Sequence, residues 1–128
     1  MTPLAKIFLA LGSIAMLLAV ALGAFGAHAL KQTLAPELMA TYETAVNYHF
    51  IHALGLLAVG LLALHLPASS GTLRWAGILM AAGLLLFSGS LYALSLSGIR
   101  GLGVLTPVGG VALLAAWLLL AVAVVRAD

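Results

Sequence analysis

Four apolar stretches, each long enough to cross a lipid bilayer, make up most of this 128-residue chain. A helix needs about 20 apolar residues to span the hydrocarbon core, and the stretches occupy residues 7–27, 45–66, 73–96 and 107–125. Lipid offers the backbone no hydrogen-bond partners, so each stretch is expected to be helical. The sequence therefore predicts one all-α domain over residues 1–128, an integral membrane bundle of four transmembrane helices joined as antiparallel hairpins.

The charged residues support this assignment because each lies between two stretches or at the end of one. They make up 6% of the chain, against about 25% in a soluble domain. No basic run alternates with aromatic residues as in proteins that follow nucleic-acid phosphates, and the chain has no cysteine for a disulfide, a thiolate metal site or a nucleophile. We expect neither a nucleic-acid partner nor, without a recognisable hydrolase motif, an enzymatic activity.

The first stretch has some features of a cleavable signal peptide. Lys6 precedes it, and Ala27-His28-Ala29 fits the small-x-small cleavage pattern. The 21 apolar residues from Ile7 to Ala27 nevertheless exceed the 7–15 of a signal-peptide core. We interpret the stretch as a retained transmembrane span.

Small residues recur every four positions in that span. Ala15, Ala19, Gly23 and Ala27 would place one smooth stripe along a helix face, and small residues let two transmembrane helices approach closely. The stripe predicts a helix-packing seam, which could join two copies of the chain in a homo-oligomer. An alanine-rich composition would give the same pattern by itself.

The ends of the later helices are marked by familiar residue pairs. Pro36-Glu37 predicts a helix start, because proline suits a first turn and glutamate favours its positive end. Residues 67–72 read Pro-Ala-Ser-Ser-Gly-Thr, a turn between antiparallel helices. Thr106-Pro107 predicts an N-cap followed by the first residue of the fourth helix.

Basic residues favour one orientation of this arrangement. With four spans both termini share a side, where Lys6, Arg74 and Arg126 lie, whereas Lys31 and Arg100 belong to the opposite side. The positive-inside rule then predicts that both termini are cytoplasmic.

Four ordered motifs carry a family resemblance: Gly23-Ala-Phe-Gly-Ala-His-Ala29, Tyr48-His-Phe-Ile-His52, Ser88-Gly-Ser-Leu-Tyr92 and Thr106-Pro-Val-Gly-Gly110. Through them nearly the whole chain resembles the YgdD-type family of small membrane proteins, family 423 of the domains of unknown function. The resemblance implies a four-span bundle in the bacterial inner membrane and brings no established activity. The family motif commonly reads Tyr-Gln-x-x-His, so His49 stands where a glutamine is common.

Polar residues gather on the side of the membrane away from the termini. His49 and His52 are three apart and lie within about 60° on one helix, and the alternation of the spans brings further polar residues to that side. The predicted polar ligand site in the outer leaflet consists of His28, His49, His52, Tyr92 and Thr106. His52 is expected to be its key residue, with Tyr92 and His28 as hydrogen-bond partners.

Three interpretations of the histidines remain open. They could be neutral groups that bond across helices and fix their register, ligands of a metal or haem, or parts of a pocket for a lipid, quinone or ion. A glutamine at position 49 in the family argues against the metal site, and we expect no cofactor. The first interpretation predicts a structural, lipid-organising or complex-assisting protein with membrane lipids as partners, and the third predicts small-ligand binding or transport.

Overall fold

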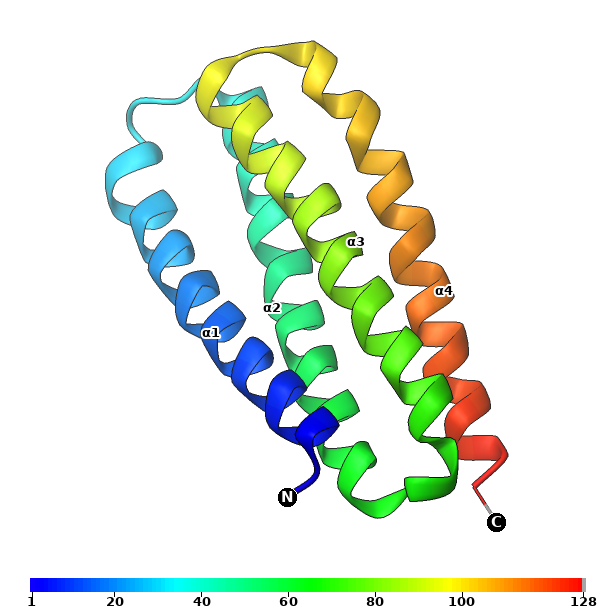
Figure 1. The fold of residues 1–128 in the computed structure, drawn as a ribbon. Helices are drawn as coiled ribbons and strands as arrows, with labels where there is room; N and C mark the ends of the chain where they lie inside the picture. The colour runs from blue at the N-terminus through cyan, green and yellow to red at the C-terminus, as the bar shows by residue number, and fades with distance from the viewer. Residues whose placement is uncertain (128) are drawn as a thin grey trace.

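The computed structural model describes residues 1–127, in which four long helices form the whole framework (Figure 1). They are α1 (Pro3–Phe25), α2 (Pro36–His65), α3 (Ser70–Ser97) and α4 (Leu105–Val125). By length and composition all four are able to cross a membrane. The predicted all-α fold is confirmed, and Figure 1 places both termini at the same end of the molecule, which we call the terminal end. The opposite end is the loop end.

Local sequence explains where most of the helices begin and end. Thr2 caps α1, where its hydroxyl oxygen accepts the Ala5 N–H at 3.2 Å, and α2 begins at Pro36 as predicted. The turn at Pro67–Ser69 forms a short 3₁₀ helix. α3 stops at Gly98, whose φ of +73° is the left-handed conformation that glycine adopts freely.

The start of α4 differs from the prediction. The helix begins at Leu105, directly after a 3₁₀ turn at Arg100–Val104, and Thr106 lies inside its first turn instead of capping it. The Thr106 hydroxyl is 2.7 Å from that of Ser90 on α3. Pro107 causes no loss there because the first N–H groups of a helix have no intrahelical partners.

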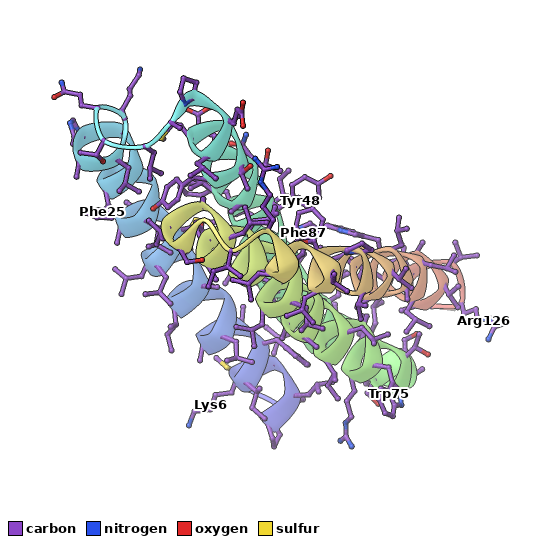
Figure 2. The ribbon with its side chains drawn as sticks, turned by 90° about the horizontal axis from the view of Figure 1, so that it is seen from above. Lys6, Phe25, Tyr48, Trp75, Phe87 and Arg126 are labelled. Atoms are coloured by element: carbon purple, nitrogen blue, oxygen red, sulfur yellow. The ribbon has the colours of Figure 1, made fainter. Side chains whose placement is uncertain are left out.

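The helices pack mainly on their neighbours in the chain. α1 packs along α2, α2 along α3, and α3 along α4. Seen from above, α1 and α4 lie on opposite sides of the α2–α3 pair (Figure 2). α1 also meets α3 near the terminal end, where Phe8 lies on Gly77 so closely that an added Cβ would be 2.3 Å from the ring. The arrangement is a zigzag and not a closed square.

The buried core follows this zigzag toward the terminal end. Most of the side chains that fill it are small or medium-sized, as is usual where transmembrane helices approach closely. Its members are Ala5, Phe8, Leu56, Val59, Ala63, Leu73, Ala76, Met80, Leu84, Leu113, Ala116, Leu120 and Ala123. Two serine hydroxyls add ties between helices: that of Ser69 donates to the Ala123 carbonyl at 3.0 Å and that of Ser88 to the Ala45 carbonyl at 2.8 Å.

The predicted small-residue stripe is correct for only part of its length. Ala19 is buried and both Ala15 and Gly23 are half-buried, whereas Ala27 is exposed. Four residues turn a helix by about 400°, so a four-residue period drifts by about 40° at each step. The last member has therefore rotated off the packed face, and Gly26 is buried in its place.

A π-helical turn at Gly26–Leu30 continues α1 and packs against Tyr42 of α2. The Tyr42 hydroxyl donates to the Leu22 carbonyl at 2.5 Å, and a Cβ on Gly26 would lie 2.4 Å from the Tyr42 ring. Glycine is thus required here by close approach. The seam on α1 packs on α2 of the same chain, so self-association stays a prediction without this face to support it.

Candidate functional site

The zigzag leaves a groove along each side of the molecule. The α2–α4 groove crosses α3 and encloses about 450 Å³, and the α1–α3 groove crosses α2 and encloses about 340 Å³. Both volumes fall in the range of about 300–1,000 Å³ that is typical of small-molecule sites. Tyr48, His52, Phe87, Pro107, Gly110, Val111, Leu113, Leu114 and Trp117 line the α2–α4 groove.

His52 supplies a hydrogen-bond acceptor to the α2–α4 groove. Its Nδ1 lies 2.6 Å from the carbonyl oxygen of Tyr48, one turn earlier on α2. A carbonyl can only accept, so Nδ1 carries the hydrogen, and in the neutral imidazole Nε2 is then the acceptor. In residues 1–127 every fully buried side-chain nitrogen and oxygen has a hydrogen-bond partner. The Nε2 atom of His52 has no such partner among these residues, so it is not fully buried. It therefore belongs to the accessible wall of the groove.

Aromatic rings surround that acceptor. The Tyr48 ring stacks on Phe87 with centroids 4.2 Å apart and lies nearly parallel to the His52 ring at 5.8 Å. Trp117 approaches His52 from α4 at 6.0 Å. Figure 2 shows Tyr48 and Phe87 side by side where α2 and α3 meet. The groove thus offers ring faces and the acceptor nitrogen of His52, which suits a flat ligand that brings a hydrogen-bond donor.

His52 lies far from both ends of α2. It is sixteen residues after Pro36 and thirteen before His65, which places it about 24 Å and 20 Å from the two ends of α2. The helix is about 45 Å long and the hydrocarbon core about 30 Å thick. Wherever the core falls along α2, His52 lies inside it. Ionisable residues at such depth commonly mark functional sites.

His49 belongs to the other groove. Its Nδ1 lies 3.0 Å from the hydroxyl of Tyr92, and both residues line the α1–α3 groove near its loop end. The predicted pairing of Tyr92 with His52 is therefore wrong. The 60° between the two histidines is enough to turn them to opposite sides of α3, since α3 packs along α2 between the two grooves.

The remaining residues of the predicted site do not join either groove. Thr106 bonds to Ser90, and His28 is exposed on the π-helical turn after α1. The five predicted residues thus do not converge on one pocket. In residues 1–127 no three histidine or acidic side chains are placed to share a metal ion.

Phe87 and Trp117 are site residues that the sequence reasoning missed. Nothing in the sequence marks Phe87 as a site residue, because any leucine-rich helix can carry a phenylalanine. Trp117 did give one: it lies twelve residues into the 21-residue α4, although tryptophan in membrane proteins is enriched at the interfaces. A tryptophan far from both helix ends indicates an internal contact, here with His52.

Fold and grooves together define a small multi-pass membrane protein with polar residues at membrane depth and no described soluble domain. The family described as "Protein of unknown function (DUF423)" matches residues 22–110, and the chain belongs to this family, as its motifs predicted.

Several relatives are similar over nearly their full length. The chain is 49% identical to UPF0382 membrane protein YwdK of Bacillus subtilis over 94% of this chain and 98% of that protein. It is 44% identical to UPF0382 membrane protein SH2409 of Staphylococcus haemolyticus, over 90% and 92% of the two chains. Identity to UPF0382 inner membrane protein YgdD of Escherichia coli K12 is 43%, over 84% and 80%. No solved structure matches the chain.

Proposed function

We propose that this protein binds a membrane amphiphile with a flat, hydroxyl-bearing head group, such as a quinol, in the α2–α4 groove. The observation that carries this proposal is the Nε2 atom of His52, an accessible acceptor held at membrane depth by the Nδ1 bond to Tyr48. A lipid acyl chain cannot donate a hydrogen bond to it. A ligand hydroxyl can, and its ring would lie against Trp117 and Phe87.

The fixed tautomer of His52 also determines which oxidation state of the ligand the site prefers. An acceptor nitrogen pairs with the hydroxyl of a quinol but not with the carbonyl oxygen of the corresponding quinone. One neutral hydrogen bond is worth about 0.5–1.5 kcal/mol, which corresponds to about a two- to tenfold difference in affinity. The site should therefore prefer the reduced ligand by about this factor.

Binding of ubiquinol-1 and ubiquinone-1 to the detergent-purified protein tests this directly. In a Trp75→Phe background, Trp117 is the remaining tryptophan and its fluorescence reports on the groove. We expect the quinol to bind about two to ten times more tightly than the quinone. His52→Leu should weaken quinol binding and remove the preference.

The matched control is His49→Gln, on the same helix but in the other groove. It should keep both the affinity and the preference, since a glutamine can also bond to Tyr92. His52→Leu should still fold, because the Tyr48 carbonyl keeps its helical partner, the backbone N–H of His52. Equal binding of quinol and quinone, or a preference that survives His52→Leu, would contradict the proposal.

We further propose that the protein resides in the bacterial inner membrane with both termini in the cytoplasm. Support comes from the YgdD relative, which is named an inner membrane protein, and from Lys6, Arg74 and Arg126 at the terminal end. Fusions at the C-terminus test the orientation in living cells. We expect a fluorescent protein to fluoresce and alkaline phosphatase to stay inactive. The reverse pattern would mean that the termini are outside.

A further inference from the structure

From its polar end near His49 and Tyr92, the α1–α3 groove continues to the terminal end of the molecule. A second hollow of about 410 Å³ lies between the same two helices and shares Leu11 and Ala81 with the first. Together the two hollows run along α3 from Arg74 to Tyr92. These residues are eighteen positions apart, about 27 Å of helix, so the groove follows most of the thickness of the hydrocarbon core.

The walls of this groove are apolar and the mouth is basic. Ile7 and Leu11 on α1 and Ile78 and Leu85 on α3 have large exposed surfaces, which suits contact with an acyl chain. Arg74 lines the hollow at the terminal end and its side chain is exposed. The groove thus has the two parts of an amphiphile site, a cation and an apolar channel below it.

No described acidic residue competes for that arginine. Glu37 and Glu43 both lie in the first half of α2, at the loop end, whereas Lys6, Arg74 and Arg126 are at the terminal end. In residues 1–127 the charged side chains of the terminal end are therefore all basic. Their charge is complementary to an anionic head group, and arginine binds phosphate oxygens with parallel N–H bonds.

We propose that an anionic phospholipid of the leaflet at the terminal end binds in the α1–α3 groove, with its phosphate on Arg74. Its acyl chain would lie between α1 and α3 toward Leu85. That residue is eleven positions from Arg74, about 16 Å of helix, which matches the half-thickness of the core, about 15 Å. This site lies on the other side of the molecule from His52 and does not depend on the function proposed above.

The neighbouring Trp75 provides a reporter for the test. It is exposed beside Arg74, and Trp117→Phe leaves it as the remaining tryptophan. The protein is reconstituted into phosphatidylcholine vesicles with increasing fractions of brominated phosphatidylglycerol, or of brominated phosphatidylcholine as the uncharged comparison. Quenching of Trp75 gives the relative association of the two lipids. We expect phosphatidylglycerol to be preferred about fivefold, the effect of one basic residue near an anionic lipid.

Three variants separate the groove from general surface charge. Arg74→Gln should abolish the preference and Arg74→Lys should restore much of it, whereas Arg126→Gln, at the same end but on α4, should leave it unchanged. Circular dichroism confirms that each variant is folded. Equal quenching by both lipids, a preference that persists in Arg74→Gln, or an equal loss in Arg126→Gln would overturn the proposal.

Discussion

Gly109→Ala is expected to separate α3 from α4 and to lower the free energy of unfolding by about 1–3 kcal/mol. A Cβ at this position would lie 2.4 Å from the backbone nitrogen of Phe87 and 2.9 Å from the carbonyl carbon of Leu86. Backbone atoms cannot rotate away as a side chain can, so the two helices must move apart. A titration of the purified protein in dodecyl maltoside with SDS, followed by near-UV circular dichroism, measures the loss.

Gly89→Ala is the matched control for this substitution. Gly89 is also a helical glycine, but its added Cβ would meet nothing within 4 Å. Alanine favours a helix over glycine by about 1 kcal/mol, so this variant should be as stable as the wild type or slightly more stable. If Gly109→Ala unfolds at the same SDS fraction as Gly89→Ala, the close approach of α3 and α4 is not required for stability.

Gly26→Ala is expected to destabilise the loop end by a comparable amount, about 1–3 kcal/mol. The added Cβ would lie 2.4 Å from the ring of Tyr42, which is fully buried and bonded to the Leu22 carbonyl. The displaced ring would press on Tyr92, whose centroid is 5.2 Å away and whose hydroxyl is bonded to His49. The damage should therefore reach the polar end of the α1–α3 groove.

A double-mutant cycle identifies the ring as the cause. In a Tyr42→Leu background the atoms that the Cβ would meet are gone, so Gly26→Ala should cost almost nothing there. The difference between the two backgrounds is the coupling energy of residues in contact. SDS titration of the four proteins measures it. An equal loss in both backgrounds would mean that the π-helical turn itself, and not the packing of Tyr42, rejects alanine.

The four spans could be predicted because their signal is local. Twenty or so apolar residues between charged or turn-forming ends are sufficient to locate a helix in a membrane protein. The start of α2 at Pro36 follows from the same kind of information. The start of α4 could not be predicted. The sequence position of Thr106 favours a capping role, but its hydroxyl is hydrogen-bonded to Ser90 on α3 instead.

The two grooves depend on information that the sequence does not contain. His49 and His52 were correctly placed on one helix, but which groove each would line depends on which helices flank α2. The stripe on α1 failed at Ala27 for a simpler reason, because its period of four is longer than the 3.6 residues of a helical turn. A stripe whose spacing alternates between three and four residues would have included Gly26 instead.

The zigzag order of the helices affects how the chain is assembled. Each helix packs mainly on the helices next to it in the chain, so most packing joins segments that are consecutive in sequence. Folds dominated by such short-range contacts form quickly, since little chain entropy is lost before contacts are gained. From α2 onward, each helix leaving the ribosome would find a packing partner already in the bilayer, and no early helix would have to wait for a distant one to cover its buried face.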